Sequence, residues 1–299
     1  MATSVSTGQS GSARGGVFAV ISIVFGLLTA CMFATSALVA SRTVKVIGAA
    51  STLAWAMLVG FVVVVPWLLV TGVPEDLSRY YVWMALAGCG NVGGILLAGS
   101  ALRIGKVGVV SPILATEGAI SAVLAALFGE SIAPIVAFLL MVIVAGIVLS
   151  AVAPDPQPLA HERPVLTVVL ATLGAVCFGL SLFAVGQMSD DLPMPWVLLP
   201  ARLVGVVALA IPLALTRNLR ITRPTLPLVV IMGFAEVLGF VFFTTGAQYQ
   251  VAVTSVLASQ FAPISAVAAY LLFKERLGRL QVLGVVVLVL GVTGLSLVS

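Results

Sequence analysis

Three ionisable side chains lie inside long apolar stretches of this sequence, where charge is rare. They are Glu117, Arg202 and Glu236. A charge in apolar surroundings is costly, so it usually faces a cavity or an oppositely charged partner. If Arg202 pairs with one acid, the other carboxyl remains to bind a cationic group or to take up and release a proton. The alternative for all three is a structural role, as an Arg–Glu pair or as a neutral acid hydrogen-bonded between helices.

Two amides and one indole also stand within apolar stretches. Asn91 and Gln260 can donate and accept hydrogen bonds, and we expect both to line a binding cavity. Trp55 can stack on a flat substrate, although tryptophans also anchor helices at a membrane surface. The only histidine, His161, adjoins Glu162 without the ligand spacing of a metal site, and the three cysteines show no paired spacing. No metal and no cofactor are expected.

The composition decides which environment must position these groups. Of 299 residues, 61% are apolar and 8% are charged, and the mean hydropathy is +1.26. Soluble domains have about 45–50% apolar and about 25% charged residues. Too few polar residues remain to cover a soluble globule, so the chain is predicted to be an integral membrane protein. The same numbers exclude a disordered chain, and the three cysteines, all inside apolar runs, exclude a disulfide scaffold.

The apolar residues are grouped in long, continuous runs. A helix needs about 20 mostly apolar residues to cross a bilayer. Such runs predict an all-α protein with ten transmembrane helices and no substantial soluble domain, whereas a β-barrel would show short alternating strands. The first run has a signal peptide as its alternative reading, although it is long for one. The ten runs cover roughly 17–40, 47–70, 79–101, 107–128, 132–152, 164–187, 194–215, 226–247, 251–272 and 280–298.

The second half of the chain repeats the first at a spacing of 145 residues. At this spacing, Ala56-Met57-Leu58-Val59-Gly60 corresponds to Ala201-Arg202-Leu203-Val204-Gly205. Gly88, Asn91 and Gly94 correspond to Gly233, Glu236 and Gly239, in that order. Ser36 corresponds to Ser181. The predicted organisation is therefore a disordered tail over 1–16, a five-helix unit over 17–152, a linker over 153–163 and a second five-helix unit over 164–299. Ser36 and Ser181 join the candidate substrate-binding or coupling residues.

The loop charges indicate that the second unit is inverted relative to the first. Five helices are an odd number, so the second copy must start on the opposite face of the membrane. Lys and Arg favour cytoplasmic loops, and they do change places between equivalent loops: Arg42 and Lys45 correspond to Asp190 and Asp191, and Glu130 stands alone where its counterpart loop carries Lys274, Arg276 and Arg279. Inverted repeats are common in secondary transporters and predict a substrate site near the midplane. The charges also predict both termini on the non-cytoplasmic side.

With this arrangement the chain resembles the EamA type of the drug/metabolite transporter superfamily. Leu127-Phe128-Gly129-Glu130 and Leu272-Phe273-Lys274-Glu275 are similar to the Leu-Gly-Glu motif that ends the fourth helix of each repeat. Pro263 matches the mid-helix proline of the family, and Arg202 matches an arginine often found in the second helix. The first repeat departs from the pattern, with Met57 in the place of Arg202 and no proline at the place of Pro263.

The resemblance implies alternating access, a pathway lined by helices 1–4 and 6–9, and substrates that are small metabolites, often exported amino acids. The aromatic amino-acid exporters are one plausible branch, and a multidrug or cation efflux carrier is the alternative within the same fold. The resemblance also implies a bacterial-type inner membrane. Protons are an open choice of coupling ion, and the sequence leaves the oligomeric state open.

Other function classes fit the residues less well. An intramembrane enzyme would need a nucleophile with its base or a metal cluster, and neither a His-Glu-x-x-His nor a Gly-x-Ser-x-Gly motif is present. A channel would need several chains around an axis or rings of like charge. The basic loops act as topology determinants, so no nucleic-acid partner is expected. The predicted partners are the lipid bilayer and a small-molecule substrate.

Overall fold

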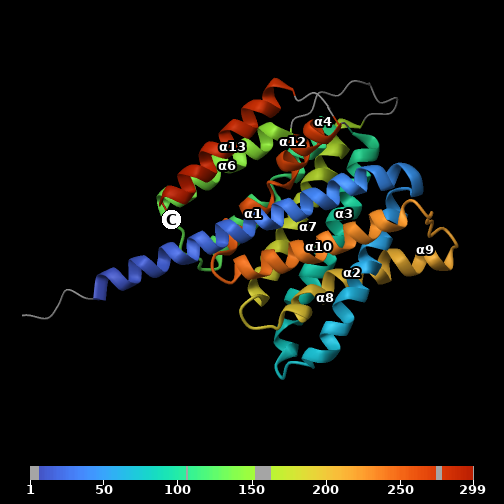
Figure 1. Ribbon diagram of the computed structural model, residues 1–299, viewed down its shortest axis with the longest axis horizontal. Coiled ribbons are helices and arrows are strands. Elements are labelled where there is room, and N and C mark those ends of the chain that lie inside the picture. Colours follow the sequence, from blue (N-terminus) through green and yellow to red (C-terminus); the bar gives the residue numbers. More distant parts are fainter. Residues whose placement is uncertain (1–6, 106, 152–162, 274–277, 299) are drawn as a thin grey trace, which may run out of the picture.

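A computed structural model describes residues 7–105, 107–151, 163–273 and 278–298, and every regular element among them is helical (Figure 1). His161, Glu162, Lys274, Glu275 and Arg276 lie outside these residues. The elements are α1 (Thr7–Ile47), α2 (Ala49–Thr71), a 3₁₀ turn (Leu77–Tyr80), α3 (Tyr81–Ile104), α4 (Val107–Leu114), α5 (Glu117–Leu127), α6 (Pro134–Ala151), α7 (Pro164–Met188), α8 (Met194–Gly205), a π-helical segment (Val206–Ala210), α9 (Ile211–Leu215), α10 (Leu226–Ala247), α11 (Val251–Ala258), α12 (Phe261–Phe273) and α13 (Arg279–Val298).

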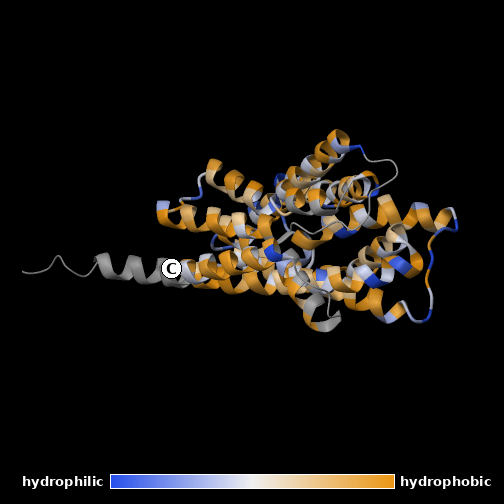
Figure 2. Cartoon of the chain, turned by 90° about the horizontal axis from the view of Figure 1, so that it is seen from above, coloured by the Kyte–Doolittle hydropathy of each residue, from blue (hydrophilic) through white to orange (hydrophobic). Residues whose placement is uncertain are grey.

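The helices are apolar around most of their circumference, as expected where lipid rather than water surrounds them (Figure 2). Among the described residues, six helical stretches are long and apolar enough to cross a membrane, and shorter apolar helices occupy the remaining predicted runs. The chain is a multi-pass, all-α membrane protein. Helix α1 begins at Thr7, inside the segment 1–16 that the sequence predicts as a disordered tail. That the segment is disordered stays a prediction.

Three of the ten predicted runs are interrupted helices. The run over 194–215 is α8 and α9 joined by the π-helical turn, which ends just before Pro212. A proline has no N–H for the carbonyl four residues earlier, so it favours such local rearrangement. The runs over 107–128 and 251–272 are fully broken, between α4 and α5 and between α11 and α12.

The two full breaks occur at equivalent places in the repeats and have local causes. Thr116 forms a short turn at the first break, where its N–H and its hydroxyl both bond to the Ile113 carbonyl. At the second break Pro263 cannot donate to Ser259, four residues before it. The Ser259 side chain also bonds to the preceding turn, where its hydroxyl donates to the Ser255 carbonyl at 3.0 Å. Broken helices place free backbone ends inside a membrane only where these line a cavity or are buried in protein.

The repeats are related by a pseudo-two-fold axis that is visible in the contacts of single residues. Gly94 packs against Phe178, and its repeat equivalent Gly239 packs against Phe33. Since Phe178 is the equivalent of Phe33, each contact is the image of the other. Two further pairs of contacts show the same relation. Gly60 packs against Arg202, and its equivalent Gly205 packs against Met57, the equivalent of Arg202. Gly146 packs against Leu288, and its equivalent Gly291 packs against Ile143, the equivalent of Leu288. Accordingly, α1 lies along α10 and α3 lies along α7 (Figure 1).

Candidate functional site

A cavity of about 310 Å³ lies between the two repeats. Its lining comes from both halves of the chain, including α1, α3, α7 and α10 and the residues beside both helix breaks. Most of the wall is apolar. The polar lining residues are Ser36, Asn91, Glu117, Ser181 and Glu236, all of which the sequence nominates. The structure thus brings together residues that are up to 200 positions apart in the chain.

Glu236 is held at the cavity wall by an ion pair. Its Oε2 lies 2.7 Å from Nη1 of Arg202, and Ser36 donates a hydrogen bond to Oε1 at 3.2 Å. Arg202 is 0% exposed and does not line the cavity; its guanidinium carbon lies 5.3 Å from the ring centre of Phe240. Arg202 is therefore a positioning residue behind the wall, and Glu236 is neutralised by it.

Glu117 is the carboxyl group that remains. It begins α5 directly after the first helix break, and it is 9% exposed. Among the residues that the structure describes, no side chain or backbone group bonds to its carboxylate. The pairing of Arg202 with Glu236 thus leaves Glu117 as an unpaired acid at the cavity.

Asn91 and Ser181 differ in what they offer to a ligand. Oδ1 of Asn91 is buried and has no hydrogen-bond partner among the described residues, so it can accept a bond from a ligand. Ser181 donates to the Ala87 carbonyl at 2.7 Å and thereby joins α7 to α3. Asn91 is available to a substrate, whereas the hydroxyl proton of Ser181 is used in packing.

Aromatic rings form much of the remaining wall, and the sequence does not nominate them. Phe33, Phe178, Phe240 and Phe261 all line the cavity. Phe33 lies edge-on to Phe240, with ring centres 5.3 Å apart. A sequence signal for two of these rings was the pair of glycine motifs around Asn91 and Glu236. Gly94 makes room for the Phe178 ring, and Gly239 makes room for the Phe33 ring.

Besides Arg202, two more of the residues predicted from the sequence do not line this cavity. The indole N–H of Trp55 donates to the Arg220 carbonyl at 3.0 Å, close to the basic loop after α9. Gln260, in the second helix break, lines a separate apolar cavity of about 440 Å³ between α12 and α13. The adjacent residue Phe261 faces the central cavity, so the second break separates the two cavities.

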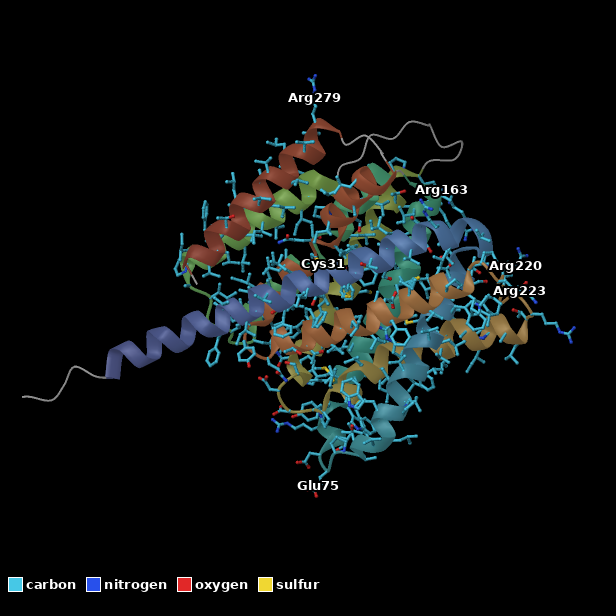
Figure 3. The ribbon with its side chains drawn as sticks, in the orientation of Figure 1. Cys31, Glu75, Arg163, Arg220, Arg223 and Arg279 are labelled. Carbon is cyan, nitrogen blue, oxygen red and sulfur yellow. The ribbon has the colours of Figure 1, made fainter. Side chains whose placement is uncertain are left out.

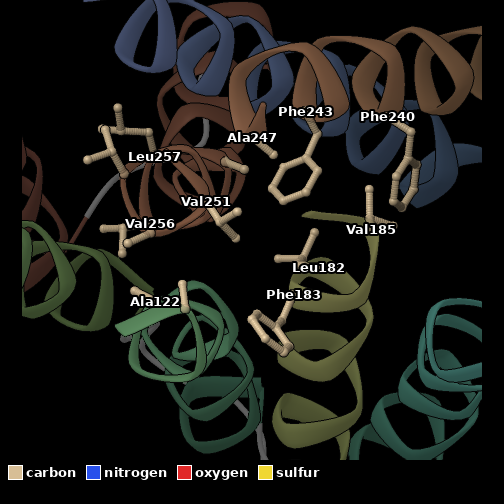
Figure 4. Close-up of a cluster of buried hydrophobic side chains, with 14 of the residues drawn as sticks. Ala122, Leu182, Phe183, Val185, Phe240, Phe243, Ala247, Val251, Val256 and Leu257 are labelled. Atoms are coloured by element: carbon tan, nitrogen blue, oxygen red, sulfur yellow. The ribbon is translucent and has the colours of Figure 1, made fainter. Parts of the chain in front are cut away.

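The cavity lies toward the end of the molecule that carries the basic loops. On α1 its lining runs from Phe33 to Ala40, toward Arg42. Figure 3 shows Arg163, Arg220 and Arg223 along one edge of the bundle and Glu75 at another. Beyond the cavity, away from the basic loops, a dense apolar cluster fills the space between the repeats, including Phe183, Val185, Phe243, Ala247 and Val251 (Figure 4).

The described residues contain no group of three or more His, Cys, Asp or Glu side chains that could hold a metal ion. What the cavity offers is one unpaired carboxyl, one unpaired amide oxygen and an aromatic wall. These are groups that can bind a ligand by hydrogen bonds and by packing against aromatic rings.

Comparison with known proteins identifies two copies of one family pattern. The model of the EamA-like transporter family matches residues 20–152 and again residues 165–297. A solved structure titled "Crystal structure of protein" superposes with a TM-score of 0.76 over 93% of this chain and 96% of that chain. At 17% sequence identity, this second likeness concerns the fold alone. A search of curated proteins found no match.

Proposed function

The chain belongs to the EamA-like transporter family, and we propose that it is an alternating-access secondary transporter that exports amino acids with aromatic or other apolar side chains. The observation that carries this proposal is the unpaired carboxyl of Glu117 in a small cavity with an aromatic wall. Membership of the family makes the chain a membrane transporter of small molecules. The proposed substrate class rests on the size and lining of the cavity.

The size and lining of the cavity favour a metabolite over a larger drug. Small-molecule sites span about 300–1,000 Å³, and this one, at about 310 Å³, is at the lower limit. The four phenylalanine rings suit an aromatic or aliphatic side chain. They also offer π faces to an ammonium group.

The polar groups are placed for the two charges of an amino acid. Glu117 and Oδ1 of Asn91 accept hydrogen bonds, and together they suit a substrate ammonium group. Glu117 also marks the N-terminus of α5, whose first N–H groups have no helical partner. Discontinuous helices in transporters direct such N-termini at a substrate carboxylate, and the lining residues Leu114 and Glu117 flank this break.

The position of the cavity supports export as the direction of transport. The cavity reaches toward the basic loops, which we place on the cytoplasmic side of a bacterial inner membrane, with both termini opposite. Substrate then enters the cavity from the cytoplasm and leaves on the other side. Glu117 is also the group best placed to bind a proton when the substrate has gone.

The test is counterflow and net flux in proteoliposomes. The panel contains radiolabelled tryptophan, phenylalanine and leucine and the organic cation tetraphenylphosphonium, with and without an imposed pH gradient. Saturable flux of an amino acid is expected, and its dependence on the gradient decides between proton coupling and facilitated diffusion. Flux of the organic cation with no flux of any amino acid would overturn the proposed substrate class.

A further inference from the structure

A carboxylate of the first repeat holds the N-terminus of a broken helix in the second repeat. Both carboxylate oxygens of Glu130 lie 3.2 Å from the backbone nitrogen of Ala252, which donates the hydrogen bond. Glu130 follows the end of α5, and Ala252 is the second residue of α11. The N–H groups of a first helical turn have no partner inside the helix and carry its positive dipole end, so a carboxylate stabilises them.

Two observations show that Glu130 is committed to this contact. The carboxyl is partly buried, which raises its pKa, while bonds from the Ala252 and Val251 N–H groups oppose that rise. No basic side chain among the described residues forms an ion pair with it. Glu130 therefore meets its hydrogen-bonding needs at the start of α11.

Helix α11 lies antiparallel along α5 and ends at the second helix break. The Ser121 and Ser255 hydroxyls bond to each other at 2.8 Å halfway along the pair. At the far end, Gly118 packs directly against Ser255 and Ser259. A shift of α11 at its N-terminus would consequently move the break and Phe261, which lines the central cavity.

The Glu130 contact lies at the end of the molecule where the pathway is closed. Val251, beside Ala252, belongs to the apolar cluster that fills the space beyond the cavity. Phe128, two residues before Glu130, packs its ring against Phe183, with centres 5.0 Å apart. Tyr80 and Asp191 also join the repeats at 2.6 Å, but that bond involves neither half of a broken helix.

We propose that Glu130 is a positioning residue for transport: by holding α11 against α5, its carboxylate keeps the pathway closed at the end opposite the basic loops. This inference rests on the proposed transport function. It places the switch between the two access states at a contact between repeats that touches no substrate. Opening toward this end requires the Glu130–Ala252 bond to break.

The experiment measures access to the cavity with a membrane-impermeant thiol reagent and needs no substrate. Cys31, Cys89 and Cys177 are replaced by serine or alanine, and Leu182→Cys provides the reporter, because Leu182 both lines the cavity and belongs to the apolar cluster. Single reference cysteines at the exposed residues Asp76 and Arg220 report which face the reagent reaches. Glu130→Gln and Glu130→Ala are compared with Glu75→Gln, an exposed acid beside Asp76.

Labelling from the Asp76 face is expected to rise about tenfold in Glu130→Ala, the change that corresponds to loss of one hydrogen bond to a charged group. Glu130→Gln keeps a neutral acceptor and is expected to lie between Glu130→Ala and the parent. Glu75→Gln should match the parent. Unchanged labelling from the Asp76 face in folded Glu130→Ala would overturn the inference, as would an equal rise from both faces, which indicates general loosening. A labelling change without amino-acid flux would leave this inference standing and count against the substrate proposal alone.

Discussion

At the residue scale, the two acids of the cavity have different roles because, among the described residues, only Glu236 has a cationic partner. Glu236 lines the cavity and forms an ion pair with Arg202, which lies behind the cavity wall. Glu117 is unpaired among the described residues. The pair occupies positions that the repeat relates to Met57 and Asn91. Met57 itself contacts Arg202, with its sulfur 3.4 Å from Nη1. The charged pair thus breaks the symmetry of an otherwise matched site.

Removing Arg202 alone should destabilise the protein strongly. Breaking a buried ion pair by deleting one partner typically costs about 3–5 kcal/mol, because the remaining charge stays buried. Arg202→Met is therefore expected to lower the free energy of unfolding by about that amount, and the double variant Arg202→Met/Glu236→Gln should recover much of it. Equilibrium unfolding in mixed detergent micelles measures both. A single variant as stable as the parent would contradict the structural role of the pair.

At the element scale, the two helix breaks touch each other at Gly118. A Cβ at this position would overlap the Ser259 hydroxyl and the Ser255 carbonyl. The end of α11 can approach the start of α5 only because residue 118 has no side chain. This close contact between α5 and α11 holds both helix breaks beside the cavity. Small serine side chains, Ser121, Ser255 and Ser259, surround Gly118 at the contact.

Gly118→Ala should therefore be destabilising in spite of the higher helix propensity of alanine. Overpacking a tight contact costs about 1–3 kcal/mol, against a gain of up to about 1 kcal/mol from propensity. The matched control is Gly99→Ala in α3, where an added Cβ meets nothing within 4 Å. Thermal unfolding should show a lower midpoint for the first variant and an unchanged or higher one for the second. Equal midpoints would argue against close contact of the two breaks.

Much of the element arrangement is predictable from the sequence, but the breaks are not. The ten apolar runs, the spacing of 145 residues and the exchange of loop charges predict the helices and their two-fold relation. Pro263 is a visible signal for the second break, whereas the first depends on the turn at Thr116, which has no distinctive motif. The Glu130–Ala252 contact joins residues 122 positions apart, and no local pattern indicates it.

The polar residues of the candidate site are predictable from the sequence, whereas the apolar residues of the cavity wall are not. Glu117, Asn91 and Glu236 stand out as polar groups in apolar runs, and the structure places them on one cavity. Trp55 and Gln260 stand out equally and lie elsewhere. These helices are apolar on all sides, so their periodicity does not distinguish the cavity face from the lipid face. For the same reason periodicity does not distinguish the four phenylalanines of the wall from exposed ones, and only the glycines opposite Phe33 and Phe178 give a signal for two of them.

At the scale of the whole molecule, the two-fold relation makes both halves contribute to the cavity. The rings of Phe33 and Phe178 enter it from opposite repeats, each against a glycine of the other repeat. The cavity lies toward the end with the basic loops, while apolar side chains fill the space between the repeats toward the other end. In the alternating-access mechanism that we propose, these two conditions exchange between the two ends of the molecule.

Substitutions at the two equivalent glycines should have comparable effects. In both Gly94→Ala and Gly239→Ala, the added methyl displaces a phenylalanine ring toward the cavity, and a lower maximal transport rate is expected for each. Gly93→Ala is the control, because its Cβ meets only Cys177 Sγ, at 3.8 Å. Initial rates at saturating substrate in proteoliposomes compare the three. A loss in one equivalent position alone would contradict the equivalence of the two contacts.

The central claim is that the unpaired carboxyl of Glu117 binds the substrate between the repeats. Its most direct test is equilibrium binding to purified protein of whichever amino acid shows saturable flux in proteoliposomes, compared among wild type, Glu117→Gln and Glu75→Gln. Glu117→Gln is expected to weaken binding by about tenfold to a hundredfold, the loss of a hydrogen bond to a charged group, while Glu75→Gln binds as wild type. Unchanged affinity in a folded Glu117→Gln protein would contradict the claim.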